Sequence, residues 1–213
     1  MRRFGDLYYP DDDIITLELK DRLERESVYR GDRLQEALKF VPGHMRTIAM
    51  DVGAHVGAWS RELARHFGRV VAIEANPANA ECLRANTAGM KVEVHQLALG
   101  AERAEVGIEK RKGGISSRVA GAGAVSMMRL DDLGPGRCAW PPSFVKVHVN
   151  GYELHVLRGA VEVLTVYKPV VTVVIKAASE RYGVTPAAIP LFMERIGYRA
   201  VSRFKPYWTF VHA

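Results

Sequence analysis

Residues 46–60, RTIAMDVGAHVGAWS, decide the fold of this chain. The apolar first part of this stretch has strand character and ends on Asp51, the chain then turns through Gly53 and Gly57, and an amphipathic pattern over 59–66 predicts a helix. Glycine permits positive φ angles and a close approach of a ligand to the backbone, and the N–H groups at a helix start attract electron-rich groups. The stretch therefore predicts a strand, a glycine turn and a helix that cradle a small molecule.

The spacing of the turn distinguishes between two kinds of nucleotide site. A dinucleotide-binding fingerprint requires GxGxxG, but His55 and Ala58 stand where the second and third glycines should be, which disfavours a nicotinamide cofactor. The pattern is instead DxGxxxG, and the next apolar strand, 70–73, ends on Glu74, about twenty residues after the turn. An acid at that distance accepts hydrogen bonds from ribose hydroxyls in nucleotide-binding α/β proteins. The alternative is an ordinary strand-to-helix turn followed by a strand that ends on Glu.

Composition places the chain among globular proteins with a substantial core. Its 213 residues are 48% hydrophobic and 25% charged, and we expect one domain, 1–213, with an N-terminal segment and helices over 1–43 and the core over 44–213. No apolar run approaches the ~20 residues that span a bilayer, so no membrane partner is expected. The start turns acidic before any apolar core, unlike a signal peptide, and neither Cys82 nor Cys138 has a CxxC partner. These features predict a cytoplasmic protein without a disulfide framework.

The formal net charge of +6 permits attraction to anionic partners. The sharpest local excess is the sequence KRKGGISSR, with Lys110, Arg111, Lys112 and Arg118. A nucleic acid or a phosphate-bearing substrate could dock there, but no interleaved aromatic residues or recognised nucleic-acid motif accompany it. The sequence therefore favours a solvated basic loop over a nucleic-acid site.

Helical and extended patterns alternate along the core. Helices are expected over 14–40 with a division at Gly31, and over 59–66, 79–86, 152–164 and 186–196. Strands are expected over 47–50, 70–73, 92–97, 144–149, 169–175, 198–204 and 207–211, with short strands and a basic loop between 105 and 128. This order predicts an α/β fold with a mostly parallel, doubly wound sheet, helices on both faces and a helical N-terminal lead-in. The segment 105–128 is expected to lie over the ligand edge of the sheet.

Seven motifs together resemble one family. In order they are DVGAHVG, VVAIEANP, QLALG, GGISS, LDDL, FVKVHVNGYELHVLRGA and KPVVTVVIK, over residues 46–176, and they resemble the FkbM-type methyltransferases. The resemblance implies a Rossmann-like class I methyltransferase fold and S-adenosyl-L-methionine as the methyl donor. It also implies O-methylation of a hydroxyl on a sugar or other small metabolite. Two alternatives stay open: a catalytically silent protein that binds the cofactor but has lost the family's acidic site, and a methyltransferase for nucleic acids or nucleotides.

The resemblance also implies a cofactor site. Its residues are expected to be Asp51, Gly53, His55, Gly57, Glu74, Leu97 and Ala98. Glu74 matches the ribose-binding acid, and Leu97 and Ala98 match the end of the third strand, where the adenine edge is expected. His55 lies inside the glycine turn, where it contacts the methionine part of the cofactor or serves as a turn residue only.

The catalytic edge departs from the family pattern. Lys146 matches the lysine of the family's KIDVEG motif, but His148 replaces its Asp and Asn150 replaces its Glu. The later strand ends on Lys176 where the family has an acid. Loss of these carboxylates disfavours a hard cation, and no histidine spacing assembles another metal site, so no metal is expected. We take His148, Lys146 and Asn150 as catalytic candidates, with His148 as the base or else a non-catalytic residue at a strand end.

Three further residues are candidates for the acceptor site. Ser116 and Ser117 could line the acceptor pocket or be turn residues of the glycine loop. Lys176 could bind an anionic substrate or neutralise a neighbour such as Glu180. Trp59 is expected to pack rather than to stack on a substrate. The predicted partner is a small-molecule acceptor, and the sequence does not indicate the oligomeric state.

Overall fold

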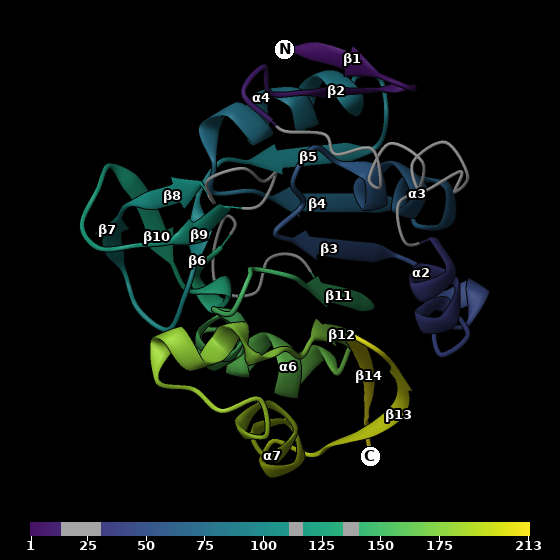
Figure 1. Cartoon of the computed structure of the whole chain (residues 1–213). Helices are drawn as coiled ribbons and strands as arrows, with labels where there is room; N and C mark the ends of the chain where they lie inside the picture. Colours follow the sequence, from purple (N-terminus) through teal and green to yellow (C-terminus); the bar gives the residue numbers. More distant parts are fainter. Residues whose placement is uncertain (14–30, 111–116, 134–140) are drawn as a thin grey trace.

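A seven-stranded sheet forms the centre of the computed structural model, which describes residues 1–13, 31–110, 117–133 and 141–213. The strand order is β13-β14-β12-β11-β3-β4-β5, and β14 alone runs in the direction opposite to the other six strands (Figure 1). The bounds are β3 Ile48–Val52, β4 Arg69–Ile73, β5 Val92–His95, β11 Phe144–Val147, β12 Val170–Val174, β13 Tyr198–Phe204 and β14 Tyr207–His212. This arrangement confirms the predicted α/β fold with a mostly parallel, doubly wound sheet.

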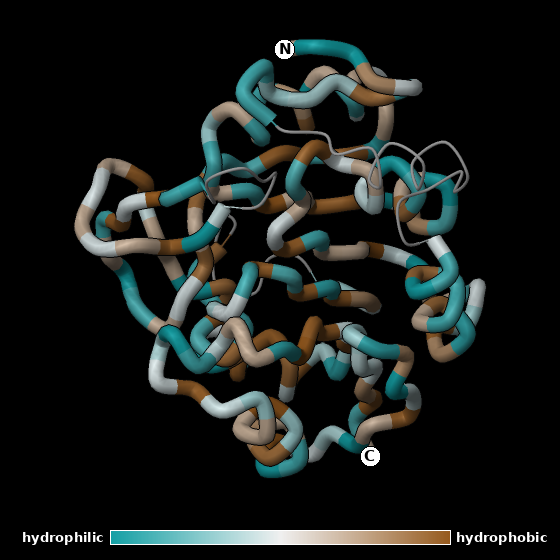
Figure 2. Tube along the Cα trace, viewed as in Figure 1, coloured by the Kyte–Doolittle hydropathy of each residue, from teal (hydrophilic) through white to brown (hydrophobic). Residues whose placement is uncertain are grey.

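Helices cover both faces of the sheet because side chains alternate along each buried strand. Ala49 and Phe144 pack on one face with α2 (Gly31–Leu38) and α3 (Ala58–His66). Their chain neighbours Met50 and Val145 pack on the other face, which is covered by α5 (Glu153–Arg158), α6 (Val161–Tyr167) and α7 (Ala188–Arg195). Hydrophobic segments therefore concentrate along the central strands (Figure 2). Among the described residues, no helix is both long and apolar enough to cross a bilayer.

Several elements have bounds that differ by a few residues from the expected ones. α4 (Pro77–Asn86) begins at Pro77 rather than at residue 79, because the Asn76 side chain caps it and Pro77 stands in its first turn, where proline is tolerated. The strand expected over 92–97 ends at His95, and β6 (Ala98–Leu99) joins a different sheet.

The single helix expected over 152–164 is also wrong, because the chain forms α5 and α6 with a break at Gly159. A Cβ atom at Gly159 would lie 1.9 Å from the carbonyl oxygen of Gly100, so a close backbone contact occupies this position. The Gly159 carbonyl accepts a hydrogen bond from the Asp131 N–H at 3.0 Å, and the Asp131 carboxylate accepts one from the Val163 N–H at 2.9 Å. The Gly159 carbonyl thus holds the segment that contains Asp131, and the Asp131 side chain in turn caps α6.

The segment from β6 to β10 forms two small sheets beside the main one (Figure 1). β6, β10 (Val125–Met128) and β7 (Ala104–Val106) form one, and β8 (Ile108–Lys110) and β9 (Ser117–Val119) form the other. Three short 3-10 turns complete the described part of the chain: η1 Gly43–Met45, η2 Leu130–Asp132 and η3 Ala177–Tyr182. The expected first half of the N-terminal helices, Arg111, Lys112, Ser116 and Cys138 lie outside the described residues.

The basic segment pairs with acids where the structure describes it. The Lys110 ammonium lies 2.7 Å from an Asp12 oxygen and 2.5 Å from an Asp13 oxygen, and Arg118 donates two hydrogen bonds to Glu109. These pairs neutralise part of the charge on which a nucleic-acid site would depend.

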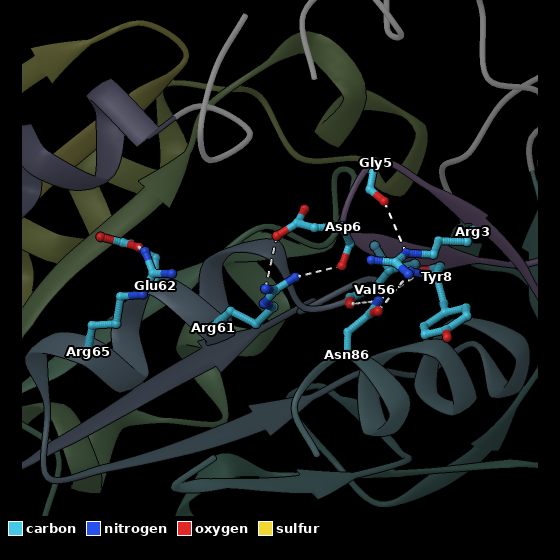
Figure 3. A network of polar contacts seen from close by, with 9 residues as sticks. All are labelled: Arg3, Gly5, Asp6, Tyr8, Val56, Arg61, Glu62, Arg65 and Asn86. Atoms are coloured by element: carbon cyan, nitrogen blue, oxygen red, sulfur yellow. Dashed lines mark hydrogen bonds and ion pairs between the residues drawn. The ribbon is translucent and has the colours of Figure 1, made fainter. Parts of the chain in front are cut away.

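An N-terminal hairpin packs against α4. β1 (Arg2–Phe4) pairs with β2 (Leu7–Tyr9), and the Asn86 side chain accepts a hydrogen bond from the Tyr8 N–H at 2.7 Å and donates to the carbonyl of Tyr8 at 2.9 Å and of Val56 at 2.8 Å. Arg61 on α3 reaches Asp6 between the two strands (Figure 3). Asn86 therefore joins the hairpin to the loop that precedes α3.

Candidate functional site

A cavity of about 390 Å³ opens at the carboxyl ends of the parallel strands, where α/β proteins bind ligands. The predicted site residues that line it are Gly53, His55, Glu74, Leu97, Ala98, Ser117, Lys146, His148, Asn150 and Lys176. Asp51 and Gly57, both in the described part of the chain, do not line it. The fold thus gathers the ends of β3, β4, β5, β11 and β12 around one space.

The two glycines of the turn are required by packing. Gly53 has a φ of +74°, and a Cβ atom there would lie 2.0 Å from the carbonyl oxygen of His148. Gly57 has a φ of +94° and precedes α3, where a Cβ atom would lie 2.6 Å from the Leu83 side chain. Positive φ disfavours other residues at both positions, and at Gly53 the contact with a backbone carbonyl disfavours them further. The turn therefore lies directly against the end of β11.

Glu74 presents a carboxylate at the end of β4, on the wall of the cavity. Its side chain accepts hydrogen bonds from the His55 N–H at 2.8 Å on one oxygen, and from the Asn76 N–H at 2.9 Å and the Asn79 side-chain amide at 3.5 Å on the other. A carboxylate has about four acceptor positions, so these three bonds fix its orientation and leave some acceptor capacity. The site fits a ligand that presents hydroxyl donors.

Lys146 connects the turn to the sheet. Its ammonium donates to the Asp51 carboxylate and to the Gly53 carbonyl, both at 2.7 Å, and the Ser60 hydroxyl donates to the second Asp51 oxygen at 2.6 Å. The side chains of Asp51 and Lys146 are 0% and 5% exposed. Both bonds of the ammonium go to the turn and the strand before it, so Lys146 holds the turn in place from the edge of the cavity.

This ion pair begins a buried polar row across the sheet. Lys146 is opposite Asp51 on β3 and opposite Thr172 on β12, and Thr172 is opposite Thr209 on β14. The two threonine hydroxyls lie 3.1 Å apart and share a hydrogen bond. All four residues are buried. The row therefore lies inside the layer that α2 and α3 cover.

His148 follows β11 and lines the cavity. Its Nδ1 lies 3.0 Å from the Tyr207 hydroxyl, and the two rings meet edge-on. Tyr207 stacks in turn on Trp59 at a centroid distance of 5.2 Å. Trp59 is buried in the core under α3, although it also lines the cavity, in line with the packing role expected for it. Tyr207 could not be predicted as a site residue, because it is 59 residues from His148 and no local pattern marks it.

Asn150 lies in a tight loop that Glu153 organises. Asn150 has a φ of +55°, and its side-chain amide donates to the Ser117 carbonyl at 2.8 Å. The Glu153 carboxylate accepts hydrogen bonds from the N–H groups of Val149 at 3.0 Å and Gly151 at 2.9 Å. Burial raises the pKa of Glu153, and these N–H bonds oppose that rise. Glu153 thus fixes the loop that carries Asn150.

An aromatic group that the sequence analysis also missed stands beside this loop. Tyr152 lines the cavity and stacks on His155 at 4.2 Å, and Tyr182 meets Tyr152 edge-on at 5.0 Å. Burial lowers the pKa of His155 and raises that of both tyrosines. Their spacing along the chain follows no motif, so only the fold brings the three rings together.

Cations outnumber carboxylates on the cavity wall. Of the described lining residues, Glu74 is the one acid, whereas Arg118, Lys146 and Lys176 are basic. Within the same part of the chain, no three His, Cys, Asp or Glu side chains are placed to hold a metal ion. The site therefore presents its acid at the end of β4 and basic groups at the ends of β11 and β12 and on β9.

Comparison with known proteins gives a family match and a shared fold. The family model of the methyltransferase FkbM domain matches residues 51–200. The FkbM methyltransferase of Methylobacillus flagellatus KT is 17% identical with a TM-score of 0.50, and the match covers 77% of this chain but only 43% of that one. The N-methyltransferase NodS of Bradyrhizobium japonicum WM9, solved with S-adenosyl-L-homocysteine, is 12% identical with a TM-score of 0.52, covering 89% and 88% of the two chains. A putative hemolysin of Lactococcus lactis is 15% identical with a TM-score of 0.55, covering 86% of each.

These identities show a shared fold alone, and no curated protein matches the chain. The family model, in contrast, spans more than half of the sequence and begins at the aspartate of the glycine turn. The chain belongs to the FkbM family of S-adenosyl-L-methionine-dependent methyltransferases.

Proposed function

We propose that this protein transfers the methyl group of S-adenosyl-L-methionine to a hydroxyl oxygen of a sugar or other small metabolite, with His148 as the base. The observation that supports the proposal is the place of His148, which lines the cavity at the end of β11 with its ring held by Tyr207. Its backbone N–H also bonds to the Val52 carbonyl at 3.0 Å, which keeps it beside the glycine turn.

The cofactor would occupy the side of the cavity near β3, β4 and β5. Glu74 would accept hydrogen bonds from its ribose hydroxyls, and Gly53 would allow its approach to the turn. Leu97 and the buried Ala98 would provide an apolar edge for adenine. The bound cofactor supplies a methyl group on a sulfonium, so the chain must place the acceptor oxygen in line and remove its proton.

His148 is suited to remove that proton because imidazole titrates near neutral pH. We assign the tautomer in which Nδ1 carries hydrogen and donates to the Tyr207 oxygen, since this leaves the lone pair on Nε2 to accept a proton. The same hydrogen bond stabilises the imidazolium that forms. Tyr207 therefore orients the base in this proposal.

Calorimetric titration with S-adenosyl-L-methionine and S-adenosyl-L-homocysteine tests the cofactor site first. We expect micromolar binding that Glu74→Ala weakens, because Glu74 is the only described carboxylate on the cavity wall. Release of S-adenosyl-L-homocysteine in the presence of sugars and nucleotides then tests turnover, and His148→Gln should abolish it while cofactor binding persists. No binding of either compound would refute the assignment.

A second function follows from the composition of the wall. Within its described residues, no carboxylate stands near His148, Asn150 or Lys176 on the cavity surface. A protein that binds the cofactor without transferring its methyl group would have this feature. Cofactor binding without turnover on any acceptor would favour it over the methyltransferase proposal.

A further inference from the structure

The hairpin of residues 108–110 and 117–119, called the arm below, lies across the ends of several sheet strands. Its strands β8 and β9 pair only with each other in the described structure. Ile108 and all three residues of β9 line the cavity. A two-stranded ribbon is at best marginally stable by itself, so the position of the arm depends on its bonds to the rest of the molecule.

Lys110 pairs with Asp12 and Asp13 at one end of the arm, and three side-chain hydrogen bonds attach the arm to the edge of the main sheet. Asn76, which follows β4, donates to the Ser117 hydroxyl at 2.9 Å. Asn150, which follows β11, donates to the Ser117 carbonyl at 2.8 Å. Tyr182 in η3, which follows β12, donates to the Val119 carbonyl at 2.7 Å. The arm is thus fixed to three strand ends at the edge where the cavity opens.

Asn150 meets two requirements that few residues meet together. Its φ of +55° is left-handed, a conformation that asparagine and aspartate tolerate better than other non-glycine residues. Its bond to the Ser117 carbonyl requires an N–H or O–H donor, which an ionised carboxylate lacks. Aspartate satisfies the first requirement and fails the second, and glutamate fails both.

We propose that Asn150 and Tyr182 are positioning residues that hold the arm in place as a wall of the cavity. The arm carries Ser117 and Arg118 into that wall, so its placement determines which groups face a bound molecule. The part of this inference that concerns a bound methyl donor rests on the proposed function. The attachment itself is a property of the ligand-free chain.

Hydrogen exchange of the full chain without ligand tests the attachment directly. Asn150→Asp removes the donor but keeps the tolerance for a left-handed φ, and Tyr182→Phe removes only a hydroxyl. Loss of one hydrogen bond should speed exchange of the arm amides about fivefold in each variant. Tyr8→Phe is the matched control, because Tyr8 lies in the N-terminal hairpin and should leave exchange in the arm unchanged.

Amides of β3 and β4 serve as an internal reference, since general destabilisation would speed their exchange as well. Faster exchange confined to the arm supports the proposal, and unchanged exchange of the arm in both Asn150→Asp and Tyr182→Phe overturns it. Dissociation of S-adenosyl-L-homocysteine should also be about fivefold faster in both variants. If S-adenosyl-L-homocysteine dissociates at the same rate from all variants, the role of the arm as a wall is refuted. If the compound binds to none of the variants, the proposed function is refuted, and the exchange result still tests the attachment.

Discussion

Replacing Lys146 with methionine tests how the glycine turn is held. Methionine keeps most of the length and apolar stem of lysine but removes the ammonium. The Asp51 carboxylate, 0% exposed, would then retain only the Ser60 hydroxyl among the two side chains that bond to it, and the Gly53 carbonyl would lose its ammonium donor.

The expected loss of stability follows from the burial of this pair. Removing one partner of a buried ion pair costs about 3–5 kcal/mol, because the remaining charge is left without compensation in a medium that solvates it poorly. Proteins of this size are stable by about 5–15 kcal/mol, so the variant should lose a large fraction of its free energy of unfolding. Adding Asp51→Asn should recover part of the loss, since the buried charge is then absent.

Urea unfolding of the wild type, Lys146→Met and the double variant measures these differences. Lys39→Met is the matched control: Lys39 bonds to Glu36 at 2.6 Å, but its side chain is 68% exposed. An exposed pair of this kind contributes about 0–1 kcal/mol. If Lys146→Met lowers the free energy of unfolding by no more than Lys39→Met, Lys146 does not hold the turn through a buried charge.

Two further substitutions have matched measurements. Gly53→Ala should lower the free energy of unfolding more than Gly89→Ala and should weaken cofactor binding. Both positions have a φ near +75°, but only at Gly53 would the new Cβ meet the His148 carbonyl. Urea unfolding and calorimetry compare the two variants, and equal losses of stability would attribute the whole effect to φ strain of about 1–3 kcal/mol. His155→Phe should alter the pH dependence of unfolding. Burial lowers the pKa of His155 below 6.5 in the folded protein, so the unfolded chain binds more protons. The stability that His155 contributes is therefore present above pH 6.5 and lost as the pH falls through the folded pKa. The phenylalanine variant should lack this loss in urea unfolding, and an identical pH profile would contradict the role assigned to burial.

The sequence predicts what local patterns determine. The strand, turn and helix of residues 46–60 follow from apolar alternation and from glycines in a fixed spacing, and Glu74 follows from its distance to the turn. Each of these signals lies within a few tens of residues. The later strands follow from the same kind of apolar pattern, and β11, β12, β13 and β14 lie where they are expected.

Features that depend on distant contacts could not be predicted in this way. The helix break at Gly159 depends on the carbonyl of Gly100, and the orientation of His148 depends on Tyr207. Lys146 was predicted as a catalytic residue from a motif, but a motif does not show that its ammonium bonds to Asp51 and Gly53. The predicted catalytic and cofactor roles of these residues stay predictions until binding and turnover are measured.

The attachment of the arm has a consequence for how acceptor specificity can evolve. Two of its three bonds end on main-chain carbonyl oxygens, those of Ser117 and Val119, which every amino acid possesses. Mutations that exchange the arm's side chains therefore leave these two anchors intact while changing the groups that face the cavity. Substitutions at residues 117–119 of this chain can therefore change the groups that meet an acceptor without releasing the arm, as long as Asn150 and Tyr182 are kept.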